Sequence, residues 1–387
     1  MAAERTVLLE DPLRPGVAAV IRSGPFLFLS GVDGDKDGKT GRVEASLFGD
    51  GPAQARNAYQ TVVDRLCECG YDGSAAVRIE HATASQDWRL ARMALWPELF
   101  GVPTQAVSQG YQGKMAGQNM ITVTTIATTG AAERAVITPG PNPGRASRIS
   151  RCGPFLFVIG VRGQHDLATG DAAEEETSEA FAQQVRFAYR NIDHHLAAAG
   201  AARDGVVRFD AFVRDAARVP DLRRVEAEHF GGPAPVATTV VGCPLGGRSD
   251  LELSAIALVP GGTKAVGPAG MDDVPATVRA GGFVFVSGVA GHVGADGRRR
   301  ADLCGELVPQ LHHALDRLEA ALDSAGTDHR SLVRLDVYLR DQHRGDVVQA
   351  WLSERFRGDA PTVTVHGVEL GPGAEAALSA IAADPRG

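Results

Sequence analysis

The sequence predicts an α+β protein made of three consecutive copies of one domain, each a mixed sheet with two helices on one face. Three observations lead to this: a strand motif that occurs three times, an amphipathic helix after each copy, and a length of 387 residues, which accommodates three domains. The motif reads GPFLFLSGV at Gly24, GPFLFVIGV at Gly153 and GGFVFVSGV at Gly281. The copies lie 129 and 128 residues apart, a domain-sized interval that is much longer than a solenoid repeat.

Each motif strand ends in Gly-Val-x-Gly, where glycine supplies the backbone freedom for a tight turn or for close approach of a ligand. The first glycines of these segments are Gly31, Gly160 and Gly288. An amphipathic helix follows, clearest in the third copy, where leucines recur every three or four residues between Leu303 and Leu322. Each helix stops at a glycine, as a left-handed C-terminal cap requires. These capping glycines are Gly70, Gly200 and Gly326.

A second strand in each copy carries an arginine and an acid two residues apart, which therefore lie on one face of the strand. The pairs are Arg78/Glu80, Arg208/Asp210 and Arg334/Asp336. A second helix and two closing strands complete each domain. Two helices cover only one face of a sheet, so the other face needs a partner. We expect the three sheets to associate around a pseudo-threefold axis, with a ring of ion pairs that fixes their register.

Two segments rich in proline and glycine mark the expected domain boundaries. They divide the chain into domains at 1–132, 133–262 and 263–387. Covalent linkage raises the effective concentration of the domains for one another, so we expect a monomeric chain that forms an intramolecular trimer. A further homodimer is left open.

Composition excludes several classes of protein. The net charge of −8 argues against general binding to nucleic acid, and no apolar run approaches the ~20 residues that span a membrane. Five cysteines without a C-x-x-C pair, and no secretion signal, predict a reduced cytoplasmic location. Adjacent histidines on the predicted helices diverge, so no metal site is expected, and no motif for a nucleotide or other cofactor is present.

The order of these motifs resembles the RidA/YjgF family of enamine and imine deaminases. The third copy is most similar, with VRAGGFVFVSGVAG and ALSAIA, while the second keeps AVITPGPNPGRASRI and LELSAIA. The resemblance implies a chorismate-mutase-like domain, a trimer around a barrel of sheets, and three clefts between neighbouring domains. It also implies an arginine in P-A-R that clamps the substrate carboxylate, and a glutamate that positions or activates water.

This chain departs from the family at both positions. Counted from the closing prolines, the arginine position holds Gln105, Ala237 and Val363. The glutamate position holds Thr122, Glu252 and Ala377, so only the middle copy keeps the acid. A substrate carboxylate left unpaired in a narrow cleft is costly, which argues against hydrolysis of ordinary 2-imino acids by the family's mechanism.

The candidate catalytic residues are Glu252, His81 and His366, whose side chains are capable of acid–base chemistry. For Glu252 the alternatives are an exposed strand face or a structural ion pair, for which Arg248 is a candidate partner. For either histidine the alternative is a satisfied core or interface residue. Gln105 suits a neutral amide, carbonyl or hydroxyl ligand. The candidate binding residues are Gln105, Tyr111, Asn119, Thr122, Arg248, Gly31, Gly160 and Gly288. Tyr111 and Asn119 lie in the polar segment SQGYQGKMAGQNM, for which a plain loop is the alternative.

The sequence thus predicts a diverged RidA-like enzyme with one specialised cleft between domains. It would hydrolyse, tautomerise or cyclise a small reactive imine, enamine or enol, in specialised bacterial biosynthesis. One alternative is a noncatalytic protein that binds a small ligand or has a regulatory role. Another is a chorismatase-like hydrolase, for which we expect a two-domain rather than a three-domain chain.

Overall fold

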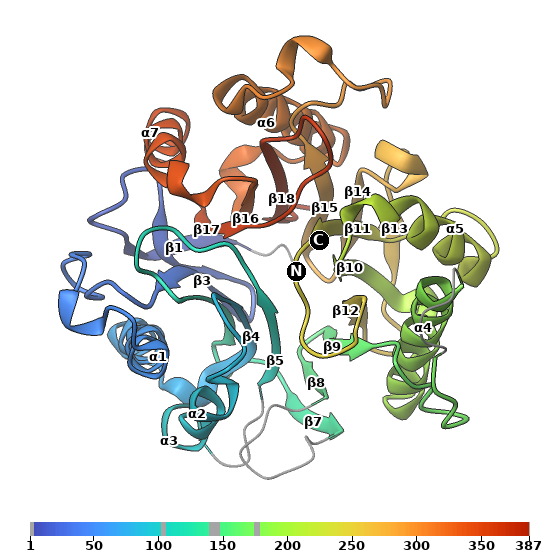
Figure 1. Cartoon of the computed structure of the whole chain (residues 1–387), viewed down its shortest axis with the longest axis horizontal. Helices are drawn as coiled ribbons and strands as arrows, with labels where there is room; N and C mark the ends of the chain where they lie inside the picture. The colour runs from blue at the N-terminus through green and yellow to red at the C-terminus, as the bar shows by residue number, and fades with distance from the viewer. Residues whose placement is uncertain (1–3, 102–105, 139–147, 174–178, 387) are drawn as a thin grey trace.

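The computed structural model describes residues 4–101, 106–138, 148–173 and 179–386. Its described strands form three six-stranded sheets, one for each copy of the motif (Figure 1). Sheet 1 contains, in spatial order, β1 (Arg5–Glu10), β2 (Ala18–Ser23), β3 (Phe26–Asp33), β6 (Ile121–Thr128), β4 (Ala76–Thr83) and β5 (Val107–Gln112). Sheet 2 contains β11 (Ala237–Gly242), β10 (Val206–Val213), β12 (Leu251–Leu258), β9 (Phe155–Arg162), β8 (Ile149–Cys152) and β7 (Arg134–Thr138). Sheet 3 contains β13 (Lys264–Val266), β14 (Thr277–Ala280), β15 (Phe283–Ala290), β18 (Ala376–Ala383), β16 (Leu332–Leu339) and β17 (Thr362–Gly367).

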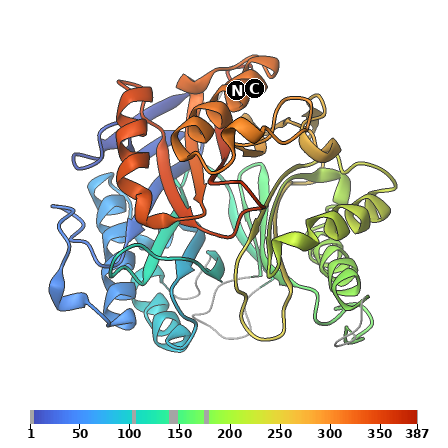
Figure 2. The same cartoon turned by 45° about the horizontal axis from the view of Figure 1, so that its top comes forward.

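Each sheet is mixed, as predicted, because one pair of strands is parallel and the other pairs are antiparallel. The parallel pairs are β4/β5, β10/β11 and β16/β17. Helices cover the outer face of every sheet (Figure 2). They are α1 (Gly51–Glu68), α2 (Arg89–Ala94), α3 (Trp96–Phe100), α4 (Ala180–Ala198), α5 (Val219–Phe230), α6 (Leu307–Ser324) and α7 (Gly345–Arg355).

The first copy differs from the other two in its second helix, which is divided into α2 and α3. Pro97 lies in the first turn of α3, where a helix does not use the backbone N–H that proline lacks. In the middle of a continuous helix this N–H would be needed as a donor, so the helix is divided here. The two segments rich in proline and glycine, which were expected to be linkers without secondary structure, each contain a short edge strand. β7 lies in the first of these segments and β13 in the second.

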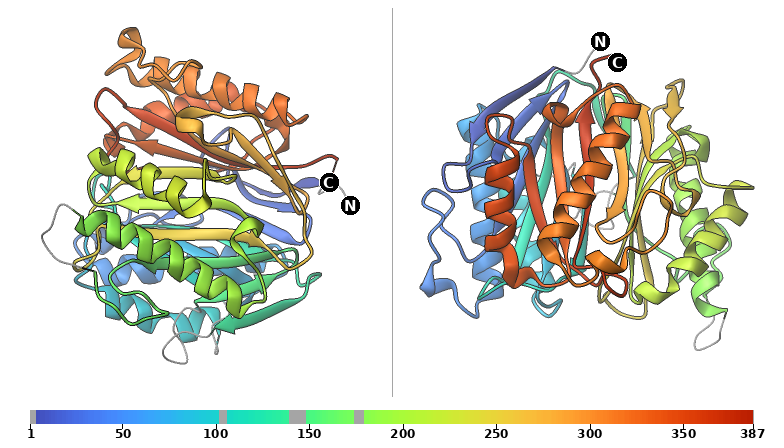
Figure 3. Two further views of the ribbon diagram at one scale, coloured as in Figure 1. Left: turned by 90° about the vertical axis from the view of Figure 1, so that its right-hand side faces the viewer. Right: turned by 90° about the horizontal axis from the view of Figure 1, so that it is seen from above.

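The inner faces of the three sheets pack against one another around a common axis (Figures 1 and 3). Near one end of this axis, phenylalanine rings from the three motif strands meet: the ring centroids of Phe26, Phe155 and Phe283 lie 5.8 to 6.0 Å apart. Such buried aromatic contacts add about 0.5–1.5 kcal/mol each beyond the area they bury. The sheet faces that two helices leave uncovered therefore find their partners within the chain.

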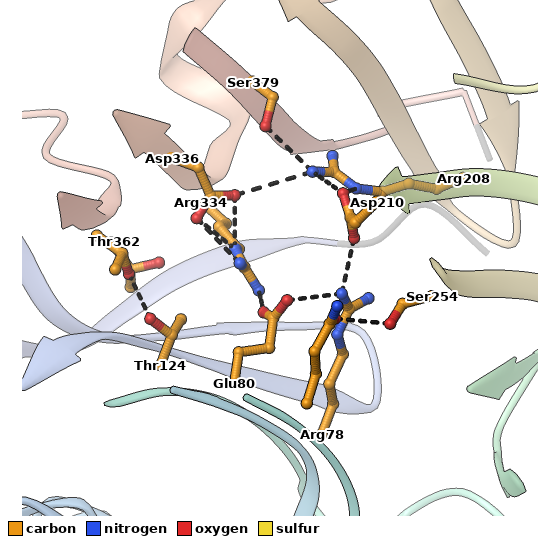
Figure 4. A network of polar contacts seen from close by, with 12 residues as sticks. Arg78, Glu80, Thr124, Arg208, Asp210, Ser254, Arg334, Asp336, Thr362 and Ser379 are labelled. Atoms are coloured by element: carbon orange, nitrogen blue, oxygen red, sulfur yellow. Dashed lines mark hydrogen bonds and ion pairs between the residues drawn. The ribbon is translucent and has the colours of Figure 1, made fainter. Parts of the chain in front are cut away.

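The ring of ion pairs expected around this axis is present (Figure 4). Each arginine contacts the acid of its own strand and an acid of a neighbouring sheet. The contacts between sheets join Arg78 to Asp210 at 2.7 Å, Arg208 to Asp336 at 3.9 Å and Arg334 to Glu80 at 2.6 Å. Burial alone would raise the pKa of the Asp336 carboxyl, but Arg334 and a hydrogen bond with His366 hold this pKa well below its usual range.

A basic residue at the start of each copy also binds that copy to another sheet. The second and third copies are bound to the preceding sheet, and the first copy is bound to the third. Arg5 donates to the carbonyl of Leu332 at 2.8 Å, Arg134 to that of Ala76, and Lys264 to that of Val206 at 2.6 Å. These contacts run in one direction around the axis, so they reinforce the cyclic order of the sheets. Among the described residues, no helix is long and apolar enough to cross a membrane.

Candidate functional site

The sheets meet at three junctions, which the fold makes equivalent. At junction 1/2, β5 lies against β9; at junction 2/3, β11 lies against β15; and at junction 3/1, β17 lies against β3. The motif glycines lie at these contacts. A side chain on Gly31 would clash with Thr364, one on Gly288 would press on Thr239, and one on Gly160 would touch the carbonyl of Ser108. Gly31, Gly160 and Gly288 thus allow close approach of a neighbouring strand, whereas ligand contact by them stays a prediction.

Junction 3/1 is occupied by the chain itself. The segment after β5 reaches sheet 3, where the backbone N–H of Lys114 donates to the carbonyl of Gly367 at 3.0 Å. Asn119 and Thr122 both donate to Asp33, at 3.2 and 2.8 Å. The side chains of Asn119 and Thr122 are therefore engaged in a local polar network, which supports a structural role for this segment.

Junction 1/2 contains Glu252, the acid that only the middle copy retains. It is buried on the inner face of β12, and its carboxylate accepts a hydrogen bond from Arg162 Nε at 2.8 Å. The ion pair considered for Glu252 is thus formed with Arg162, while Arg248 is exposed on the loop that precedes β12. Burial raises the pKa of Glu252 even though Arg162 opposes the shift. This acid is held in an ion pair of sheet 2.

His81 does not share a junction face with Glu252. It lies on the helix-covered face of β4, buried beside Gly110, where an added side chain would meet His81 Nε2 at 2.1 Å. The equivalent residues, Ala211 and Val337, belong to the apolar cores beneath the helices of sheets 2 and 3. Burial, and after it the charge of Arg92, holds the pKa of His81 well below its usual range, so the imidazole is neutral at pH 7.

His366 and Tyr111 lie at the axis instead of in a cleft. Tyr111 Oη lies 2.5 Å from His366 Nδ1, and His366 Nε2 lies 3.1 Å from Asp336. Tyr111 also stacks on Phe212 of sheet 2, with 4.5 Å between the ring centroids. Tyr111 and His366 therefore connect three sheets beside the ring of ion pairs. These contacts support the alternative that His366 is a core residue with satisfied hydrogen bonds.

A cavity of about 280 Å³ opens at junction 2/3. β11 forms one wall, with Thr239, and β15 forms the other, with Gly288. Ala377 of β18 lies in the lining at the position of the family's glutamate. Since this cavity has the size of a small-molecule site and lies between two copies, it is the strongest candidate site among the described residues.

Three polar side chains of this cavity have buried atoms without a hydrogen-bond partner among the described residues: Thr239 Oγ1, His292 Nδ1 and Arg223 Nε. Thr239 and His292 are 5% and 6% exposed. Arg317 reaches the same cavity from α6, where its Nη1 donates to the carbonyl of Val293 at 2.7 Å. Unsatisfied buried polar groups are costly, so they indicate a ligand or ordered water.

The cavity lining contains two arginines, Arg223 and Arg317, of which Arg223 is paired with Glu226 at 2.7 Å. Burial lowers the pKa of His292, and Arg299 and Arg340 lower it further, so this imidazole is neutral at pH 7 and able to accept a proton. Burial also lowers the pKa of Arg317, whose charge persists. Glu369 lines the mouth but is exposed. A neutral base beside fixed positive charge suits proton transfer on a substrate that carries or develops negative charge.

Sequence reasoning missed the polar residues of this cavity. His292 directly follows the repeated Gly-Val-x-Gly segment, where the other copies have Asp35 and Gln164. That difference was a usable signal. The sequence contains no signal for Arg223 and Arg317, because each occupies a position that is typical of the solvent-exposed face of an amphipathic helix. Gln105 lies outside the described residues. Among those residues no group of three potential metal ligands occurs.

The strand register also corrects the count from the prolines. Arg78, Arg208 and Arg334 lie beside Val107, Ala237 and Thr362, which are therefore the equivalent residues. Val363 follows Thr362 and points into the core beneath the helices, whereas Ala237 faces the axis. Thr362, like Ala237 and Val363, is uncharged, so the expected absence of the arginine from these two copies does not depend on the correction.

Comparisons with known proteins agree with the fold. The family described as Endoribonuclease L-PSP matches residues 147–259 and 272–383, and the chain belongs to this family, also known as RidA/YjgF. RutC family protein YjgH of Escherichia coli K12 is 32% identical over 117 residues, which are 30% of this chain and 84% of YjgH. The solved structure of Rv2704 from Mycobacterium tuberculosis, a YjgF/YER057c/UK114 family member, is 27% identical and covers 33% of this chain and 100% of Rv2704, with a TM-score of 0.26.

A solved chorismatase has the same arrangement of sheets. It covers 80% of this chain and 93% of its own, with a TM-score of 0.54 and 13% identity. This share is larger than two of the three repeats, while the expectation that a chorismatase has a two-domain chain stays a prediction. At this identity the likeness establishes a common fold, and the chain is a RidA-family protein with a chorismatase-like tandem arrangement.

Proposed function

We propose that this protein is an acid–base enzyme acting on a small reactive imine, enamine or enol in the cavity at junction 2/3. One observation carries the proposal: His292, neutral and with an unpaired Nδ1, lines a cavity of about 280 Å³ between two family domains, and Arg317 lines the same cavity. His292 would take a proton from water or from the substrate, and Arg317 would face the negative charge that develops.

This assignment moves the predicted active cleft away from Glu252. Glu252 is engaged by Arg162 in junction 1/2, whereas the cavity at junction 2/3 has Ala377 at the equivalent position. The proposed enzyme would therefore have replaced the strand arginine and glutamate of the family with a loop histidine and a helix arginine. A role in specialised bacterial biosynthesis, in the cytoplasm, remains part of the proposal.

The test is release of ammonia and keto acid from enzymatically generated 2-aminoacrylate. We expect wild type and Glu252→Gln to exceed the uncatalysed rate, and His292→Gln to lose about 10²-fold or more, as removal of a general base does. A rate lost in Glu252→Gln and kept in His292→Gln would place the chemistry at junction 1/2 instead. Chorismate serves as a second substrate in the same series.

A noncatalytic ligand-binding protein is the second candidate, and Ala377 favours it, because the family's acid is missing from the open cavity. Saturable binding at junction 2/3 without turnover of either substrate would support this alternative. We do not assign RNA cleavage, which the family description names, because the net charge of −8 disfavours binding to a phosphate backbone.

A further inference from the structure

The cavity at junction 2/3 lies beside a cross-strand pair of small residues. Ala290 of β15 pairs with Ala377 of β18, and both residues line the cavity. We call this pair the alanine floor. The strand register places Arg162 and Glu252 at the equivalent positions of sheet 2, where they form an ion pair at 2.8 Å. The charged side chains that fill this place at junction 1/2 are therefore absent from junction 2/3.

Sheet 1 also has a polar pair at these positions. Asp33 of β3 pairs with Thr122 of β6, and Thr122 Oγ1 donates to the Asp33 carboxylate at 2.8 Å. Lys36 Nζ lies 2.6 Å from the other oxygen of the same carboxylate. Since the fold accepts charged side chains at two of its three equivalent junctions, it does not itself require alanines at the third. The alanine floor therefore points to a property of the ligand.

A hydrogen bond between sheets distinguishes the three junctions in the same way. At junction 3/1, Thr364 Oγ1 lies 2.8 Å from Thr124 Oγ1, and at junction 1/2, Ser254 donates to Gln109 at 2.6 Å. The register makes Thr239 of β11 equivalent to Thr364 and Gln109, since each lies beside the ring acid of its own sheet. Among the described residues Thr239 Oγ1 has no partner, so its hydroxyl is available to a ligand.

The surface around the alanine floor is apolar. Leu370 and Ala377 pack against a buried cluster that includes Val241 and Tyr338, and all four residues line the cavity. At the position of the family's arginine, β11 has Ala237. A carboxylate or ammonium group placed on the floor would lose its water without gaining an ion-pair partner on these strands, which is costly. A hydrocarbon group fits this surface instead, because its burial is favourable.

One cation of the lining is available to a negative group. Arg317 of α6 donates to the carbonyl of Val293 at 2.7 Å and to the sulfur of Met271 at 3.5 Å, and it forms no ion pair with a described carboxylate. Arg223 of α5, by contrast, is bound to Glu226 at 2.7 Å. The cavity thus has an apolar surface on its strands and an unpaired positive charge on a helix.

We propose that the ligand of this cavity is amphipathic, with a hydrocarbon group on the alanine floor and an anionic group at Arg317. The inference rests on the proposed function and narrows its substrate to an imine, enamine or enol that carries both groups. Thr239 would bind a polar atom between them. Ala290 and Ala377 are then specificity residues, which select against a second charge at the hydrocarbon end of the substrate.

Two small aromatic acids test this selectivity, with binding to the full chain measured by isothermal titration calorimetry. p-Toluate and terephthalate share a benzene ring with one carboxylate, and they differ at the opposite end, which is a methyl group or a second carboxylate. We expect wild type to bind p-toluate saturably and terephthalate at least about tenfold more weakly, because the second carboxylate would be desolvated on the alanine floor. Ala290→Arg should reverse this order, because the new guanidinium would pair with that carboxylate.

Two control variants separate charge from size and from position. Ala290→Gln adds a neutral side chain, so it should weaken p-toluate binding without improving terephthalate binding. Ala295→Arg adds the same charge as Ala290→Arg at an exposed loop position outside the lining, and it should keep the wild-type preference. Circular dichroism checks the folding of each variant. If Ala290→Arg does not fold, the preference of wild type between the two probes still decides the proposal.

Three results would overturn the inference: no saturable binding of p-toluate to wild type, equal affinity of wild type for both probes, or the same preference in wild type and folded Ala290→Arg. A reversed preference in Ala295→Arg would also contradict it. Failure of the proposed function has a different signature, because probe binding does not depend on turnover. Selective binding of p-toluate without acceleration of 2-aminoacrylate hydrolysis would refute the catalysis and leave the ligand selectivity standing.

Discussion

Replacement of Arg208 by leucine tests whether the ring of ion pairs holds the three sheets in register. Arg208 is 3% exposed and contacts Asp210 at 2.8 Å, Asp336 at 3.9 Å and Ser379 Oγ at 3.1 Å. The variant leaves Asp210 with Arg78 alone and removes one of the three contacts between sheets. Breaking a buried pair by removing one partner costs about 3–5 kcal/mol, because the other charge stays buried.

The size of this effect is large against the whole stability of a domain, which is about 5–15 kcal/mol. Urea unfolding, followed by circular dichroism and by fluorescence, measures it and shows whether the three sheets still unfold together. The matched control is Arg56→Leu, which breaks an ion pair with Glu98 whose side chains are 50% and 58% exposed. That variant should lose less than about 1 kcal/mol.

The difference in unfolding free energy between wild type and Arg208→Leu should depend on pH in a definite direction. Burial alone would raise the pKa of Asp210, but Arg208 and Arg78 hold it below its usual value. Its contribution to stability is therefore present above the unfolded pKa of about 3.9 and is lost as the pH falls through the folded value. The difference between wild type and Arg208→Leu should shrink at acid pH. Equal stability of Arg208→Leu and Arg56→Leu at pH 7 would refute the structural role of the ring.

Two further predictions concern individual histidines. Burial, with Arg148 and His194, lowers the pKa of His195 to about 4, so between pH 6.5 and 4 the unfolded chain binds a proton that the folded chain does not. The urea midpoint should therefore fall as the pH is lowered through this range, and it should fall less in His195→Gln. Gly110→Ala should destabilise the protein by about 1–3 kcal/mol, because its Cβ would lie 2.1 Å from His81 Nε2. The double variant with His81→Ala should recover most of that loss in urea unfolding, and a purely additive result would contradict the proposed clash.

The threefold organisation could be predicted because it is written in the sequence as repetition. The motif strands and their following helices occur where expected, and the Arg/acid spacing correctly indicated the ring around the axis. Local pattern was insufficient for the second helix of the first copy, where Pro97 divides a segment that is continuous elsewhere. Register was also beyond simple counting, since the proline-based alignment of Ala237 and Val363 assigns residues of opposite strand faces to one position.

The candidate site was less predictable, because it depends on which surfaces two distant copies bring together. The spacing of Glu252 between two leucines gave its face correctly, but the sequence did not indicate that Arg162 pairs with it. His366 and Tyr111 are 255 positions apart and meet only because the sheets close around the axis. Arg317, on a helix that reads as amphipathic, lines the cavity for the same reason.

The central claim is that the cavity at junction 2/3 is the working site, and filling it is the most direct test. Ala377→Phe places a ring in the cavity, while Ala377→Ser keeps its size, and both are compared with wild type for ammonia release from 2-aminoacrylate. We predict that the serine variant keeps the wild-type rate and that the phenylalanine variant falls to the uncatalysed rate. Equal rates above background in all three proteins would contradict the account, as would no acceleration by wild type.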